Sequence, residues 1–147
     1  DFRDVASEVG GGFAAPRVGR GLACGDFDGD GDIDLLLTTN GGPAYLYRND
    51  VAPGARSLRL RLRGVKTNRD AIGAVVRMST AEGTQSRVVK TGSSYLSQSE
   101  LALTFGLGRR DRADRVVVEW PGSGTQEFRS VAAGRYDLTE GGKLLQV

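Results

Sequence analysis

The chain of 147 residues is long enough for one ordinary domain with a hydrophobic core, or for one domain and a fragment. It contains no histidine and a single cysteine, Cys24, which excludes a Ser-His-Asp triad, a Cys-His triad, an ordinary zinc site and an intrachain disulfide. The longest apolar runs have three or four residues, far fewer than a membrane-spanning segment needs.

The net charge of +2 hides an uneven distribution. Five of the 18 acidic residues lie between positions 26 and 34, which leaves 20 basic against 13 acidic residues elsewhere. Only three of the basic residues are lysines, and arginine suits bidentate contact with carboxylates, sulfates and phosphates. The composition therefore indicates an acidic polysaccharide or an extracellular protein as partner. Nucleic acid is not favoured, because basic and aromatic residues do not interleave and no nucleic-acid-binding motif is found.

Glycine-rich turns recur about every ten residues, and they predict an all-β fold without a helix. The expected strands are 21–24, 34–39, 44–48, 57–63, 74–79, 85–91, 100–105, 115–120, 126–130, 135–138 and 144–147. The clearest is SLRLRLR, 57–63, in which leucines and arginines alternate and must occupy opposite faces. The arginine stripe is interpreted as the solvated face of this strand, with a ligand surface as the alternative.

The segment DFDGDGDID, residues 26–34, places aspartates on alternate positions. Carboxylates this close repel one another, and a bound cation offsets the repulsion. Oxygen ligands at positions 1, 3, 5, 7 and 9 with a glycine at position 6, here Gly31, form a calcium-loop pattern. The predicted metal ligands are Asp26, Asp28, Asp30, Asp32 and Asp34. Asp32 is expected to bind through its backbone carbonyl, and the alternative for the whole segment is a plain solvated turn.

The loop differs from an EF-hand, because position 12 is Leu37 rather than a bidentate glutamate. The residues that follow it, LLLTT, are apolar or β-branched and predict a strand instead of an exit helix. Asp34 is therefore the expected bidentate ligand. A boundary is predicted near Pro53 and Gly54, which divides the chain into residues 1–52, with the calcium loop, and residues 53–147, a β-sandwich.

Two family resemblances follow from these motifs. The stretch GRGLACGDFDGDGDIDLLLTTNGGPAYLYRND, residues 19–50, resembles one FG-GAP (VCBS-type) repeat, a family that builds β-propellers from several such repeats. The segments NRDAIGAVV, TGSSYLSQSE, FGLG and VVVEWPGSGTQE, which follow in order from Asn68, resemble the ASPIC/UnbV domain. The second resemblance covers residues 57–141, with PGSG in place of a commoner proline-serine-glycine turn.

The resemblances imply a secreted, cell-surface or periplasmic calcium-binding protein, and they assign no reaction to the domain. The function expected from them is a non-catalytic adhesion or recognition module for glycans or proteins, cut from a larger repeat protein. The alternatives are a structural domain without a ligand of its own and a polysaccharide-active enzyme. A lone repeat also leaves sheet edges uncovered, so it is expected to pack on the sandwich or to mediate self-association.

Three smaller motifs have two interpretations each. Trp120, before Pro121, is either a core anchor or a platform for a sugar ring. Asn68 with its two charged neighbours forms either an Asx-type turn with an internal ion pair or a ligand site. The polar loop SSYLSQSE, 93–100, is either a capped turn or a modest binding rim.

Overall fold

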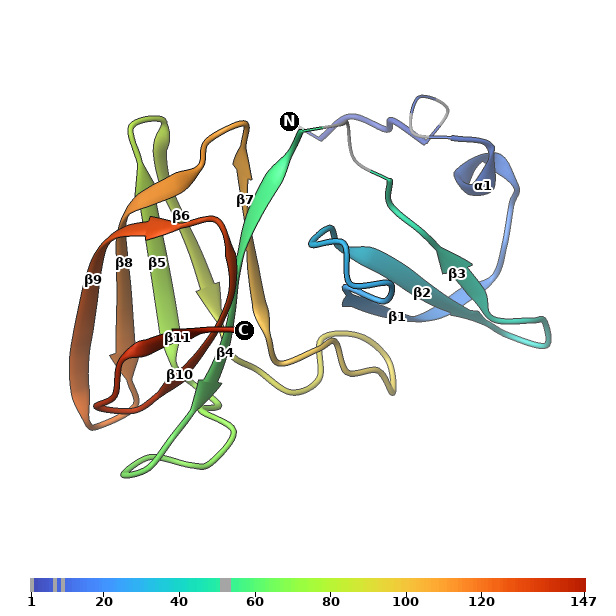
Figure 1. Ribbon diagram of the computed structural model, residues 1–147. Coiled ribbons are helices and arrows are strands. Elements are labelled where there is room, and N and C mark those ends of the chain that lie inside the picture. The colour runs from blue at the N-terminus through green and yellow to red at the C-terminus, as the bar shows by residue number, and fades with distance from the viewer. Residues whose placement is uncertain (1, 7, 9, 51–53) are drawn as a thin grey trace.

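The computed structural model describes residues 2–6, 8, 10–50 and 54–147 (Figure 1). A small three-stranded sheet near the N-terminus lies beside a larger body of eight strands. The small sheet contains β1 (Gly19–Gly25), β2 (Asp34–Thr39) and β3 (Tyr45–Tyr47), all antiparallel. The short helix α1 (Gly11–Ala14) precedes it, and Phe13 stacks on Tyr47 with ring centroids 4.7 Å apart.

The larger body is a sandwich of two four-stranded sheets. One sheet has the order β11-β10-β4-β7 and the other has the order β6-β5-β8-β9. Strands β4 and β10 run parallel, and the remaining neighbours in both sheets are antiparallel. The eight strands are β4 (Arg56–Arg63), β5 (Val75–Thr80), β6 (Gly83–Val88), β7 (Leu103–Gly108), β8 (Arg112–Trp120), β9 (Gly124–Ala132), β10 (Gly134–Thr139) and β11 (Leu144–Gln146).

The hydrophobic core lies between the two sheets of the sandwich. Its completely buried members include Leu58, Phe105 and Val118, and its limits in the sequence are residues 58 and 138. Within the described part of the chain, the N-terminal sheet contributes no apolar side chain to this core. Burial of alternate residues in β4 confirms that the leucines of SLRLRLR face inward.

The all-β class with a sandwich is confirmed, and each predicted strand overlaps an observed one. Strand β7 begins at Leu103 rather than at residue 100, because Glu100 bonds to the N-terminal sheet and to Arg59 instead of joining a ladder. Helix α1 was not predicted, since four residues are too few to show a helical period. The domain limits 1–52 and 53–147 stay a prediction, and residues 51–53 lie outside the described residues.

Candidate metal centre

The aspartate loop connects β1 to β2 and begins and ends at the paired residues Gly25 and Asp34. Gly29 and Gly31 have φ angles of +80° and +97°, which L side chains rarely adopt. A Cβ at Gly31 would also lie 2.6 Å from Ser57 Oγ, so this glycine allows the loop to approach the start of β4. Within the loop, the N–H of Asp30 donates to Asp28 Oδ1 at 3.3 Å.

Asp34 is the buried end of the loop, with 2% of its surface exposed. Its Oδ2 accepts the N–H of Phe27 and its Oδ1 accepts the N–H of Asn49, both at 2.8 Å. One side chain thus connects the start of the loop to Asn49, two residues beyond the end of β3. Each carboxylate oxygen retains a second lone pair, so coordination by Asp34 is still open to it. Its bidentate coordination stays a prediction.

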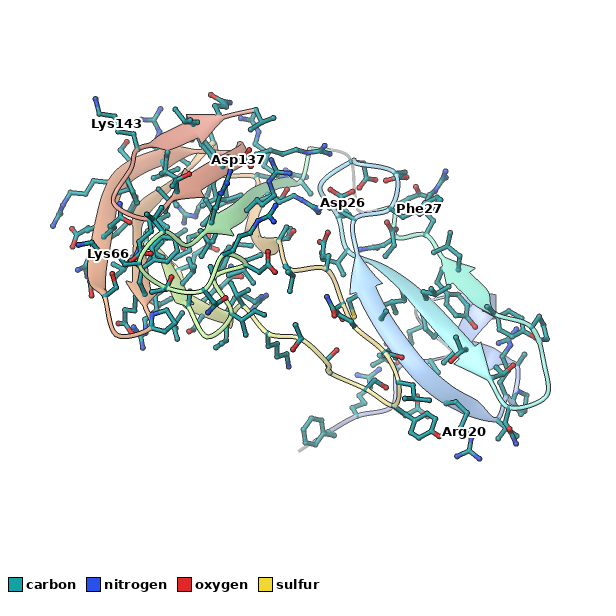
Figure 2. All side chains as sticks on the ribbon, turned by 90° about the horizontal axis from the view of Figure 1, so that it is seen from below. Arg20, Asp26, Phe27, Lys66, Asp137 and Lys143 are labelled. Carbon is teal, nitrogen blue, oxygen red and sulfur yellow. The ribbon has the colours of Figure 1, made fainter. Side chains whose placement is uncertain are left out.

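The side chain of Asp26 is buried where the loop meets the sandwich, with 1% of its surface exposed. Figure 2 shows it at the end of the N-terminal sheet nearest the sandwich, with Arg20 at the opposite end. Asp26 Oδ2 lies 3.0 Å from Arg59 Nη1 and 3.5 Å from Arg135 Nη2. Asp26 Oδ1 is buried and has no hydrogen-bond partner among the residues that the structure describes. A buried carboxylate oxygen without a partner is costly, and a cation at this position would satisfy it.

Two groups of carboxylates bring ligand atoms within 4.8 Å of one another. The first contains Asp26, Asp28 and Asp34, and the second contains Asp28, Asp30 and Asp50. Both meet the donor set of a hard cation, which takes oxygen ligands. Asp32 belongs to neither group, and its N–H donates to Asp30 Oδ1 at 2.9 Å. Coordination by the five predicted aspartates stays a prediction.

All three residues of the second group are exposed, and Arg48 lies beside two of them. Arg48 Nε lies 2.8 Å from Asp50 Oδ1 and 3.9 Å from Asp28 Oδ2. The hydrogen bond to Asp50, followed by the charges of Asp50, Asp28 and Asp30, raises the pKa of Arg48. The first group also has cationic neighbours, but it is the better candidate for a cation site, because the side chains of Asp26 and Asp34 are buried and Asp26 Oδ1 has no hydrogen-bond partner among the described residues.

Sequence reasoning missed four residues around the loop: Asp50, Arg59, Glu100 and Arg135. Arg59 is 20% exposed at its side chain and binds Glu100 through both guanidinium ends, with a distance of 2.9 Å at Nη1. The solvated-face interpretation of the arginine stripe is thus wrong for Arg59. Its sequence context is the same as that of Arg61, so the alternation of SLRLRLR gives no signal that separates them.

The segment between β6 and β7 reaches out to the edge strand β1 (Figure 1). The N–H groups of Leu22 and Cys24 donate to the hydroxyls of Ser94 and Ser99, at 3.2 and 3.1 Å. The N–H of Glu100 donates to the carbonyl of Cys24 at 3.1 Å. The polar loop 93–100 therefore covers part of the edge of the small sheet. It also closes its own turn, because the hydroxyl of Ser97 donates to the carbonyl of Tyr95 at 2.9 Å, which agrees with the capped-turn interpretation.

One face of the N-terminal sheet is less covered. Leu36 and Leu46 are paired neighbours on β2 and β3, and they are 43% and 48% exposed. With Phe27, at 72% exposure, they line a cavity of about 240 Å³. Self-association through this sheet stays a prediction.

Two further motifs have structural roles. Trp120 is 4% exposed, and its Nε1–H donates to Gln126 Oε1 at 2.7 Å, which confirms the core anchor and removes the sugar platform. Asn68 exchanges two hydrogen bonds with the backbone of Ile72, at 2.7 and 2.8 Å, which confirms a turn. An ion pair between Arg69 and Asp70 is not found among the described residues, so that part of the prediction is wrong.

Comparison with known proteins places residues 64–144 in the family described as ASPIC and UnbV. The chain belongs to the ASPIC/UnbV family. This ASPIC/UnbV chain is also 36% identical over 135 residues to cartilage acidic protein 1 of Mus musculus and 35% identical over 136 residues to that of Homo sapiens, with 88% of the chain covered in both cases. The protein of Xenopus tropicalis is 37% identical over 134 residues, or 86% of the chain.

The similarity extends beyond the family match into the N-terminal sheet, because it covers more of the chain than residues 64–144. The ASPIC/UnbV chain spans about 20% of the length of each of these relatives. In the part of the chain that the structure describes, no helix has the length and apolar character needed to span a membrane.

Proposed function

We propose that this chain is a non-catalytic calcium-binding module of an extracellular, cell-surface or periplasmic protein. In this proposal an FG-GAP/VCBS-type repeat, held by the cation, is docked on the ASPIC/UnbV sandwich, and the sandwich takes part in adhesion or recognition. The single observation that carries the calcium site is the buried, unpartnered Oδ1 of Asp26 within the group of Asp26, Asp28 and Asp34.

Calcium is favoured over other metals by the chemistry of the donors. The loop offers only carboxylate and carbonyl oxygens, which suit hard cations, and the chain has no histidine to favour a transition metal. Asp26, Asp28 and Asp34 would hold the cation through their side chains. Asp30 would contribute from the exposed side of the loop, and Asp32 through its carbonyl, as the spacing predicts. The relatives take their name from cartilage, which supports an extracellular location.

A ligand surface on the sandwich is supported by a few basic residues rather than by the whole arginine-rich surface. Most arginines of the sandwich are paired, for example Arg61 with Asp137 and Arg115 with Glu127 at 2.6 Å each. Arg63 and Arg69, by contrast, have no ion pair among the described residues and line a cavity of about 600 Å³, whose lining also contains Asp70 and the paired Arg61 and Asp137. This cavity is where a carboxylate or sulfate of an acidic polysaccharide, or an acidic protein segment, would bind.

The widespread pairing of charges also supports the second candidate, a structural domain without a ligand of its own. The same pairing argues against an enzyme, because acids such as Glu119 and Glu127 are committed to arginine neighbours instead of facing one another across a cavity.

Calcium titration of the purified protein tests the proposal. With a dissociation constant of about 0.1 mM and about 1 mM free calcium, linkage gives about 1.4 kcal/mol of stabilisation. We therefore expect chelation by EDTA to lower the melting temperature by a few degrees, and calorimetry to detect binding. Asp26→Asn should abolish both effects, whereas the matched variant Asp114→Asn, at an exposed position outside the loop, should retain them. Identical melting in EDTA and in excess calcium would contradict the proposal.

A further inference from the structure

Without a cation, the repulsion between the aspartates of the loop must be offset by other groups. Asp34 accepts two backbone N–H groups, and Asp28 lies 3.9 Å from Arg48. Asp26 is the most buried of the carboxylates that contact a cationic side chain, and its partners both come from the sandwich. The positive charges that offset the aspartate loop therefore come partly from residues more than 30 positions away in the sequence.

Arg59 and Arg135 reach Asp26 from adjacent strands. They are direct neighbours in the parallel pairing of β4 with β10, so both guanidinium groups leave the same face of the sheet. Arg59 is held in place by Glu100, which in turn bonds to β1 through its N–H. Arg135 Nη2 lies so near the loop that a Cβ at Gly29 would be 3.1 Å from it. The two arginines are thus built against the loop rather than free in solvent.

The two carboxylate oxygens of Asp26 have different surroundings. Oδ2 faces the guanidinium groups, and Oδ1 is buried without a partner among the described residues. Fixed positive charges beside a carboxylate stabilise the loop when it is empty of metal, and they repel a cation that binds to the other oxygen. Both effects make the binding of a cation less favourable and so lower the affinity of the loop for it.

We propose that Arg59, assisted by Arg135, acts as a fixed counter-ion of the aspartate loop. Its positive charge keeps the loop folded in the absence of metal and lowers the affinity of the loop for calcium. The inference rests on the proposed calcium site. It implies that the stability of the protein depends only modestly on calcium because the sandwich already supplies part of the positive charge. It also makes the contact between the N-terminal sheet and the sandwich part of the metal centre, since the same carboxylate serves both.

The test compares Arg59→Gln with Arg61→Gln. Both arginines lie on β4 and each binds one acid through two nitrogens, but only Arg59 also contacts Asp26. Melting temperatures are measured in EDTA and in saturating calcium, and the dissociation constant is measured by calorimetry at low salt. For Arg59→Gln we expect a lower melting temperature in EDTA, a wider gap between EDTA and calcium, and about tenfold tighter calcium binding.

Further variants separate charge from shape. Arg59→Gln with Glu100→Gln removes the acid that the single variant leaves unpaired, and it should still bind calcium more tightly than the wild type. Arg59→Lys retains the charge and should bind calcium about as weakly as the wild type. If Arg59→Gln does not fold, Arg135→Gln, which removes a longer contact of 3.5 Å at a side chain 46% exposed, should shift the affinity less but in the same direction.

Two results would overturn the inference: an equal drop in melting temperature with and without calcium, as a purely structural ion pair gives, or a dissociation constant that stays the same or rises. A wild-type protein that binds no calcium would instead overturn the proposed function, and the inference with it. The wild-type titration therefore tells the two failures apart.

Discussion

The sandwich and the N-terminal sheet are stabilised by different kinds of contact. Between the two sheets of the sandwich, side chains such as Leu60, Val76 and Met78 are fully buried and supply the hydrophobic stabilisation. Within strands β1 to β3 the buried polar side chain is a carboxylate, that of Asp34, and Leu36 and Leu46 are partly exposed. The comparison indicates that the sandwich folds by apolar burial, whereas the small sheet depends on charges, backbone hydrogen bonds and its contact with the sandwich.

The largest expected effect of a single substitution is in the sandwich core. Phe105 is 0% exposed, so Phe105→Ala should lower the free energy of unfolding by about 3–5 kcal/mol through lost burial and a cavity. Leu46→Ala, at a leucine of the N-terminal sheet that is 48% exposed, should cost less than about 1 kcal/mol. Denaturant titrations of both variants check the difference. Equal losses would mean that the two regions share one core.

Local sequence patterns predicted the strands and the buried face of β4 because alternation of Leu58 and its neighbours is a short-range property. The same patterns predicted the aspartate loop as a candidate metal site, since its five aspartates come from one continuous segment. They did not separate Arg59 from Arg61, because the difference depends on the parallel pairing of β4 with β10 and on the position of the N-terminal sheet. Contacts of this kind join residues that are distant in sequence.

The contacts of the polar loop 93–100 were likewise not predictable from the sequence. Its composition predicted a polar turn, but its hydroxyls accept hydrogen bonds from β1, about 75 residues earlier in the chain. Nothing in the sequence around Ser94 and Ser99 shows whether their hydroxyls bond to a distant strand or to their own turn. Helix α1 was missed for a different reason, because Phe13 is its one large apolar side chain and its stabilising contact is the ring of Tyr47.

The second prediction concerns a carboxylate within the sandwich, Glu140. Its Oε2 accepts the N–H groups of Val65, Lys66 and Thr67 at 2.7 to 3.0 Å, and Ser123 donates to its Oε1. Desolvation alone would raise the pKa of Glu140, but the hydrogen bonds from Ser123 and from the three backbone groups outweigh it and lower the pKa to about 2. The loop that begins after β4 is thus anchored by an ionised side chain.

Because the pKa of Glu140 is lower in the folded state than the ordinary value of 4.5, its stabilisation is fully present above that value. It is lost as the pH falls towards about 2. Glu140→Gln should therefore lower the melting temperature at neutral pH, and the gap to the wild type should narrow as the pH falls. The control is Glu82→Gln, which removes an exposed ion pair with Arg110 and should change little at either pH. A gap that does not depend on pH would contradict an anchoring role for the charge.

The smallest expected change in stability comes from substitutions at the edge of the N-terminal sheet. Ser99 is half-buried and accepts the N–H of Cys24, so Ser99→Ala leaves a partly buried donor unpaired and should cost about 1 kcal/mol. Ser94 makes the equivalent bond to Leu22 in an exposed position, where water can replace the hydroxyl, so Ser94→Ala should cost close to nothing.

Hydrogen exchange measured at each amide distinguishes these two variants better than a global melt does. In Ser99→Ala, exchange should accelerate at Cys24 and its neighbours on β1, while the amides of β5 and β8 remain protected as in the wild type. Such a local response would mean that the N-terminal sheet can open while the sandwich stays folded. Faster exchange in both regions would mean instead that they unfold together. The sandwich and the N-terminal sheet would then differ in the kind of contact that they contain, but they would not unfold independently.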